Sequence, residues 1–361
     1  MTHGEYLVVA DRVFDGHRAH DRHAVAVASG RVVAVGPEKD LRGAGRRIEI
    51  AGTVLPGFID LHTHVRLDRT PLPTVLRHGL TTVRDTGGPL VPPSGGDGEL
   101  RVLGSGPILT APGGYPVPVF GAEAAREVSG ADAARAAVRH LAEGGAALVK
   151  VGLEPGGSPG APWSAHETSA PPPWPMPSVE TVRAVVAEAH TCGLLVSAHL
   201  SGPAAAELAL DAGVDEWAHV PCDALPDELI DRAAAADVKV LGTLDTLSRT
   251  SGVWRNASRL AEAGVRLLYG TDLAHPDVPW GIDAFELQLM LHTAHGAVTP
   301  EEVLSAATAR AGKHLGLAPL GTLAEGAPAD LIGVRGDALA RFKLLEYPDL
   351  VMSGGVVVKE P

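Results

Sequence analysis

The stretch PGFIDLHTH, Pro56 to His64, decides the fold, because the pattern of apolar and polar residues changes there. Before it, Val, Ile and Tyr alternate with polar residues between glycines, which indicates short antiparallel strands. The segments ADLIGVRG and DLVMSGGVVVKE near the other end repeat this style. We therefore predict that residues 1–53 and 316–361 pair with each other into a small composite β-sandwich.

Residues 54–315 follow another pattern, in which short apolar strands alternate with Ala-rich helical stretches such as ADAARAAVRHLAEGG. The eight candidate strands are FIDLHT, LTTVRD, LRVLGS, ALVKV, LLVSAH, EWAHV, VKVLGT and RLLYGTD. Eight βα units predict an α/β fold of the (β/α)8 TIM-like barrel type. An open doubly wound sheet is the alternative, but no G-x-G-x-x-G fingerprint follows the first strand.

Composition narrows the class of protein. The formal net charge of −13 over 361 residues disfavours nucleic acid and anionic membrane surfaces as partners. Two cysteines suit a reducing compartment, residues 1–10 lack the features of a signal peptide, and no run reaches the roughly 18 apolar residues of a membrane span. We expect a cytoplasmic protein that acts on a small-molecule or peptide substrate. The sequence is compatible with both a monomer and a homo-oligomer.

Two histidines end the first predicted barrel strand. His62 and His64 are two residues apart, so their side chains share one side of a strand. Two solvent-exposed histidines without a shared role would also explain this spacing. However, four other strands also end in polar residues: Lys150, His199, His219 and Asp272. Parallel barrel strands end on one common face, and histidine and carboxylate are ordinary zinc ligands. The six residues therefore predict a metal site.

Lys150 is the unusual member of this set. The chain has only six lysines against 24 arginines, and this one lies between two valines. A buried salt bridge is one explanation. The other is a lysine whose pKa is lowered by burial, so that its neutral amine is nucleophilic. Such an amine takes up carbon dioxide to form a carbamate, an anionic ligand that bridges two metals.

The combination of HTH, VKV, SAHL, WAHV and YGTD resembles the amidohydrolase superfamily, specifically its two-metal members with a carboxylated lysine. The phrases PGFIDLHTH, GLTTVRDTGG and LGTLAEGAPADLIGV resemble its imidazolonepropionase-like and prolidase-like branch. This resemblance implies one divalent metal, most simply zinc, on His62, His64 and Asp272, and a second on His199 and His219. It further implies that carboxylated Lys150 bridges the two metals together with a hydroxide.

The implied activity is metal-dependent hydrolysis of a carbon–nitrogen bond in an amide, a peptide or a cyclic amide. Asp272 would act as general base and then as general acid. A deaminase and an ester or lactone hydrolase on the same site are alternatives, although deaminases of this superfamily usually lack a ligating lysine. A non-catalytic scaffold relative is a further alternative, but such relatives typically lose metal ligands.

Three residues are candidates for contact with the substrate. Arg66 follows the histidines in HTHVR, a spacing that resembles dihydroorotase-like relatives, in which the arginine binds a substrate carboxylate. Tyr115 follows the third predicted strand, and His275 lies three residues beyond Asp272. Residues 154–177 contain eight prolines and two tryptophans and form either a lid or an irregular connection.

Overall fold

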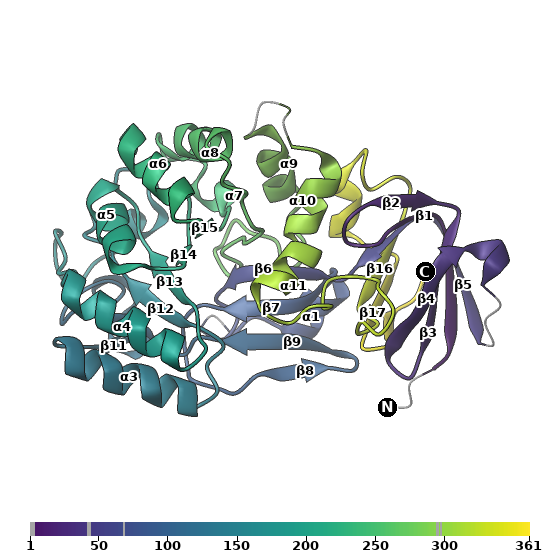
Figure 1. Ribbon diagram of the computed structural model, residues 1–361, viewed down its shortest axis with the longest axis horizontal. Coiled ribbons are helices and arrows are strands. Elements are labelled where there is room, and N and C mark those ends of the chain that lie inside the picture. The colour runs from purple at the N-terminus through teal and green to yellow at the C-terminus, as the bar shows by residue number, and fades with distance from the viewer. Residues whose placement is uncertain (1–3, 42–44, 68, 294–295, 297) are drawn as a thin grey trace.

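The computed structural model describes residues 4–41, 45–67, 69–293, 296 and 298–361. Figure 1 shows a sheet built from both ends of the chain, in purple and yellow, beside a larger α/β part in blue to green. Within the described residues, no helix combines the length and the apolar character that crossing a membrane requires.

The strands from the two chain ends form one eight-stranded sheet in the order β18-β17-β16-β5-β1-β3-β4, with β2 paired to β1. These strands are β1 (Tyr6–Phe14), β2 (Ala19–Asp21), β3 (His23–Ala28), β4 (Arg31–Pro37), β5 (Arg46–Pro56), β16 (Leu331–Arg335), β17 (Leu350–Ser353) and β18 (Val356–Lys359). Antiparallel pairing of β5 with β16 joins the two ends of the chain. Val8, Val25, Ile48 and Leu331 belong to the apolar cluster of this sheet, as the alternation of apolar and polar residues predicts.

The α/β part holds its strands in two further sheets. One has the order β6-β7-β9-β8, and the other has the order β11-β10-β12-β13-β14-β15. Their strands are β6 (Phe58–Thr63), β7 (Leu80–Asp85), β8 (Ser94–Gly96), β9 (Glu99–Gly104), β10 (Ile108–Thr110), β11 (Ala125–Glu127), β12 (Val149–Gly152), β13 (Val196–His199), β14 (Glu216–Trp217) and β15 (Lys239–Val240). All of these pairs are parallel except β8 with β9.

The predicted strand RLLYGTD is an extended run with isolated bridges instead of a continuous strand. On one side the amide of Leu268 donates to Val240 of β15, and on the other the amide of Asp272 donates to His62 of β6, both at 2.9 Å. The carbonyl of Tyr269 accepts from the amide of Leu61 in β6 at 3.2 Å, and the carbonyl of Gly270 accepts from the amide of Thr243 at 2.8 Å. At Gly270 the backbone passes so close to β6 that a Cβ would lie 2.9 Å from the Cβ of His62. The run thus hydrogen-bonds to the last strand of one parallel sheet and the first strand of the other.

The helices of this part are α1 (Leu72–Arg77), α2 (Val117–Phe120), α3 (Ala131–Glu143), α4 (Val179–Thr191), α5 (Pro203–Ala212), α6 (Asp227–Ala235), α7 (Leu244–Leu247), α8 (Val253–Glu262), α9 (Ala284–His292), α10 (Pro300–Ala306) and α11 (Ala309–His314). Several begin at side-chain caps. Ser178 accepts from the amide of Thr181 at the start of α4, and Thr299 and Glu302 form a capping box around Pro300 in α10.

A buried ion pair crosses the interior between the two parallel sheets. Arg84 of β7 donates to both carboxylate oxygens of Glu216 of β14, at 2.6 and 2.7 Å. His314 at the end of α11 contacts the same carboxylate at 2.6 Å. Burial raises the pKa of Glu216, but Arg84 and His314 outweigh this effect and hold the pKa well below its ordinary value. The ion pair therefore stabilises the fold above the unfolded-state pKa of roughly 4.3, and this stabilisation is lost as the pH falls further.

Replacing Glu216 by leucine is expected to lower the free energy of unfolding by roughly 3–5 kcal/mol, because it leaves the buried guanidinium of Arg84 without its counter-ion. Urea unfolding followed by circular dichroism measures the loss. The double variant Arg84→Met/Glu216→Leu should recover most of it, since no charge is then buried alone. A double variant as unstable as the single one would contradict this explanation.

Candidate metal centre

The first group of candidate ligands lies where β6 meets the run RLLYGTD, residues 266–272. The Nε2 atoms of His62 and His64 are 3.3 Å apart, and they lie 3.5 and 3.2 Å from Oδ1 of Asp272. The period-two geometry of β6 places both histidines on one side, and the amide of Asp272 is bound to the carbonyl of His62. Among the described residues, these three side chains form a group that could hold a metal ion.

Asp60 fixes the two segments that carry this group. Its carboxylate accepts from the amide of His62 at 2.9 Å, and from the amide and hydroxyl of Thr271 at 3.2 and 2.6 Å. The side chain is fully buried, which raises its pKa to about 7 despite these hydrogen bonds. The sequence shows Asp60 as a polar residue within an apolar strand. Its hydrogen-bond partner Thr271, however, is 211 residues away in the sequence.

The second group of candidate ligands lies against the first. Nε2 of His219 is 3.0 Å from Nδ1 of His199, and the ring of His219 lies 4.6 Å from the ring of His62 between centroids. His62 Nδ1 faces the carbonyl of Ala218 at 3.0 Å, and His219 Nδ1 faces the hydroxyl of Thr243 at 3.0 Å. A hydrogen bond at Nδ1 leaves Nε2 as the acceptor that a metal requires.

Burial favours the neutral form of three of these histidines, which is the form in which imidazole binds metals. Burial lowers the pKa of His62 and His199 well below the ordinary value and lowers that of His219 to about 3. A charged Lys150 would lower all three further, so its amine lies within electrostatic reach of both groups. The structure therefore brings His62, His64, Asp272, His199 and His219 together, with Lys150 within electrostatic reach of them.

Lys150 lies fully buried on β12, and among the described residues its Nζ has no hydrogen-bond partner. Burial lowers the pKa of this amine to about 7, although the carboxylates of Glu216 and Asp272 oppose the shift. The salt bridge considered from the sequence is therefore absent among the described residues: Glu216 is bound to Arg84 instead. A buried, unpaired amine is costly unless it has a further chemical role.

A cavity of about 230 Å³ opens onto both groups. Its lining includes the candidate ligands His64, His199, His219 and Asp272 and the predicted substrate contacts Tyr115 and His275. The ring of Tyr115 stacks on that of His199 at 4.2 Å between centroids, and burial raises its pKa well above the ordinary value. The amide of His275 donates to the carbonyl of Asp272 at 3.0 Å.

Arg66, the third predicted contact, does not line this cavity. Its guanidinium reaches the carbonyl of Val91 at 3.5 Å and the hydroxyl of Ser94 at 3.2 Å. Both partners belong to the segment around β8, so the side chain is turned toward that hairpin. The spacing in HTHVR could not reveal this direction, since it depends on a segment 25 residues further along.

The proline-rich stretch 154–177 packs over the second group. Trp163 meets His199 edge-on at 4.6 Å between ring centroids, and Trp174 stacks on Tyr115 at 6.1 Å. Both indoles are buried, and the amide of Trp174 donates to the carbonyl of Pro155 at 2.7 Å. This segment therefore forms part of the cavity wall through Trp163, whereas Trp174 packs against Tyr115.

Glu154 is a further residue that the sequence did not reveal. It is fully buried at the end of β12, with Oε2 3.8 Å from His199 Nε2 and Oε1 accepting from the amide of Gly156 at 2.6 Å. Burial raises its pKa to about 7. The carboxylate thus lies near the imidazole of His199 without a hydrogen bond to it.

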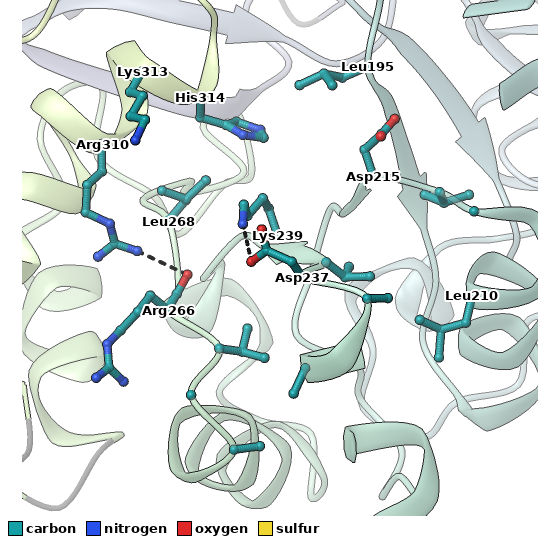
Figure 2. A pocket seen from close by; sticks show the side chains of 18 residues that line it. Leu195, Leu210, Asp215, Asp237, Lys239, Arg266, Leu268, Arg310, Lys313 and His314 are labelled. Atoms are coloured by element: carbon teal, nitrogen blue, oxygen red, sulfur yellow. Dashed lines mark hydrogen bonds and ion pairs between the residues drawn. The ribbon is translucent and has the colours of Figure 1, made fainter. Parts of the chain in front are cut away.

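A larger cavity of about 830 Å³ lies at the opposite ends of the strands. Figure 2 shows its side chains, with Lys239 paired to Asp237 and Arg310 bound to the carbonyl of Arg266. Asp215 and Lys239 stand at the starts of β14 and β15, whereas the ligand candidates stand at the strand ends. Active sites of parallel α/β folds lie at the carboxyl ends of strands, so the smaller cavity is the candidate site.

A sequence profile of the amidohydrolase family matches residues 53–358. The chain belongs to the amidohydrolase family. The resemblance seen in the sequence is thereby confirmed. The ochratoxinase of Aspergillus niger is 30% identical to this amidohydrolase over 284 residues, which is 72% of this chain and 55% of the relative. The chain thus spans about half the length of this curated relative.

A second curated relative and a solved structure also resemble this chain. The imidazolonepropionase of Deinococcus deserti is 30% identical over 168 residues, 44% of this amidohydrolase and 39% of the relative. The crystal structure of a putative prolidase from Bifidobacterium longum superposes with a TM-score of 0.80 at 24% identity, over 100% of this chain and 96% of the other. The relatives are hydrolases of carbon–nitrogen bonds.

Proposed function

We propose that this chain is a metal-dependent amidohydrolase that cleaves the carbon–nitrogen bond of an amide, a peptide or a cyclic amide. The observation that carries the proposal is the buried, unpaired amine of Lys150 among the candidate histidines and Asp272. In a hydrophobic interior that arrangement is unfavourable, but it suits a pair of divalent cations with a carbamate between them. Family membership supports the same conclusion.

We assign the ligands as two sets that share Lys150. His62, His64 and Asp272 would hold one cation, for which zinc is the expected metal, and His199 and His219 would hold the other. The fit rests on the donors: imidazoles, of which His62, His199 and His219 have a pKa lowered by burial, a carboxylate, and an amine whose pKa burial lowers to about 7, which favours uptake of carbon dioxide.

The chain's own residues account for proton transfer. When bound, the two cations would acidify a water molecule and polarise the carbonyl of the substrate. Asp272 accepts a proton from that water and delivers it to the leaving nitrogen, as general base and then as general acid. Tyr115 and His275 line the same cavity and are the proposed substrate contacts. Asp60 holds the segments of His62 and Asp272 in place through its hydrogen bonds to the amide of His62 and to Thr271.

The proposed architecture follows from the same contacts. The two sheets of the α/β part and the run at residues 266–272 would together form a closed (β/α)8 barrel over residues 54–315. Hydrogen bonds of that run to β15 and β6, and a 2.8 Å bond from the amide of Ala147 to Gly104 of β9, support closure. Residues 1–53 and 316–361 would form the composite β-sandwich.

Removing the metal tests this function. Dialysis against a chelator is expected to abolish release of amine from a panel of N-benzoyl amides. Zinc together with bicarbonate should restore the activity and bring the metal content to about two equivalents per chain, as a two-metal hydrolase requires. Undiminished turnover by protein from which elemental analysis finds no metal would refute the proposal.

A further inference from the structure

Thr243 has a backbone conformation that its side chain disfavours. It lies in the left-handed region, with φ at 45° and ψ at 32°, where a β-branched residue is an outlier and glycine or asparagine fits more easily. Such a conformation persists only where the surrounding contacts hold it. Here the amide of Thr243 donates to the carbonyl of Gly270 at 2.8 Å, and its carbonyl accepts from the amide of Leu247 at 3.1 Å.

The hydroxyl of Thr243 is directed to a candidate ligand and not to its own helix. Thr243 is the N-cap of α7, a position where threonine normally accepts from an amide two or three residues later. Within the described part of the chain its side chain makes no such hydrogen bond, and its hydroxyl lies 3.0 Å from Nδ1 of His219. The helix therefore needs another group to satisfy its first amides.

Glu286 of α9 supplies this cap. Its Oε2 accepts from the amide of Asp245, in the first turn of α7, at 2.8 Å. The side chain is fully buried, and a Cβ at Gly242 would overlap its other oxygen, Oε1. Burial, and then the charge of Asp283, raise the pKa of Glu286 well above its ordinary value, which favours the neutral carboxyl. Glu286 thus reaches from its own helix to the turn at residues 243–247.

This turn contacts both groups of candidate ligands. Its N-cap hydroxyl faces His219 of the second group. The hydroxyl of Thr246 donates to the carbonyl of Thr271 at 2.9 Å, directly before Asp272 of the first group. At metal sites, partners of this kind orient the ligating imidazole, and their loss typically lowers the metal affinity by about 10–100-fold. A displaced turn would therefore weaken metal binding without removing a ligand.

We propose that Glu286 is a positioning residue of the metal centre. It caps the turn at residues 243–247 and thereby frees the hydroxyl of Thr243 to accept from Nδ1 of His219, which leaves Nε2 for a cation. The proposal rests on the proposed function, because it assigns a residue to the same centre. It accounts for a carboxyl that is fully buried in a helix whose other buried residues are apolar.

Two substitutions of Glu286 separate its hydrogen bond from its volume. Glu286→Gln keeps the shape and an uncharged acceptor for the amide of Asp245, whereas Glu286→Met fills the space without an acceptor. Competition with a chromophoric chelator measures the zinc affinity of each metal-depleted protein. Glu286→Met is expected to bind zinc about 10–100-fold more weakly than the parent, and Glu286→Gln within about 3-fold of it. Parental affinity in Glu286→Met, or an equal loss in Glu286→Gln, would overturn the proposal.

Thr243 provides the same test without a change in α9. Thr243→Val keeps the branched shape without the hydroxyl and should lose zinc affinity to a similar extent, whereas Thr243→Ser keeps the hydroxyl and should lose little. Val25→Ala, in the apolar cluster of the sheet from the two chain ends, is the control for lost stability. It should lower the melting temperature and leave the zinc affinity unchanged. An equal loss of affinity in Val25→Ala would make general destabilisation the cause and overturn the proposal.

Hydrogen exchange followed by mass spectrometry reports on the turn in metal-free protein. Peptides that cover residues 243–248 should exchange faster in Glu286→Met than in the parent or Glu286→Gln, because the amide of Asp245 has lost its buried acceptor. Unchanged exchange would overturn the proposal, and so would faster exchange with unchanged zinc affinity. Failure of the parent itself to bind zinc would refute the proposed function, whereas equal zinc binding by parent and variants would overturn only the role of Glu286.

Discussion

Asp272→Asn is expected to lower kcat by about 10²–10⁴-fold while leaving the fold intact, because the variant loses only the group that carries the proton. Asparagine has the same shape as aspartate and tolerates the left-handed backbone found here, with φ at 64°. Its side-chain oxygen keeps the position from which Asp272 contacts His62 and His64. An amide, however, neither accepts nor releases a proton near neutral pH.

Steady-state kinetics with metal-loaded protein measures this loss, and thermal unfolding and elemental analysis serve as controls. The expected pattern is a melting temperature within a few degrees of the parent, most of the metal retained, and a deep fall in kcat. A variant with near-parental kcat would exclude Asp272 as the proton carrier. Elemental analysis distinguishes a variant that is inactive because it has lost its metal from one that is inactive because it has lost the proton carrier.

Lys150→Ala is expected to lose bound metal and activity together. The loss should exceed the roughly 10–100-fold that removal of an outer hydrogen bond costs at metal sites, because a ligand itself is missing. The alanine leaves a small space at a position that is fully buried. Short carboxylates such as acetate or propionate should enter this space and restore part of both the metal content and the rate.

Lys239→Ala is the matched control, since Lys239 is partly exposed and pairs with Asp237 far from the candidate site. It should retain full metal and activity. Labelled bicarbonate adds a spectroscopic measurement: a ¹³C carbamate signal is expected in the parent and in Lys239→Ala but not in Lys150→Ala. Full activity of Lys150→Ala without added carboxylate would remove the carbamate from the mechanism.

The main site residues could be predicted because elementary geometry governs them. Side chains two apart on a strand share a side, and parallel strands end on one face, so His62, His64 and His219 are expected to converge before any coordinates are known. Lys150 was recognisable because a lysine between valines at a strand end has no access to water. Family membership, inferred from the same strand ends, is confirmed.

The remaining features depend on contacts between distant parts of the chain. Asp60 acquires its role only when Thr271 pairs beside it, and Glu154 comes near His199 only when the chain folds. The direction of Arg66 depends on the hairpin that holds Val91 and Ser94. The predicted strand RLLYGTD forms only an isolated bridge, at Leu268, and its backbone enters the left-handed region at Asp272. Local sequence patterns contain none of this information.

The hydrogen bonds between the run RLLYGTD and β6 also bear on how the protein matures. The first ligand group joins His62 to Asp272, so it exists only after most of the chain has been synthesised and segments separated by 210 residues have met. Such non-local pairing is slow to form in folding. Metal acquisition would therefore be a late event, and a ribosome-bound chain that ends before Asp272 should not retain zinc through this group.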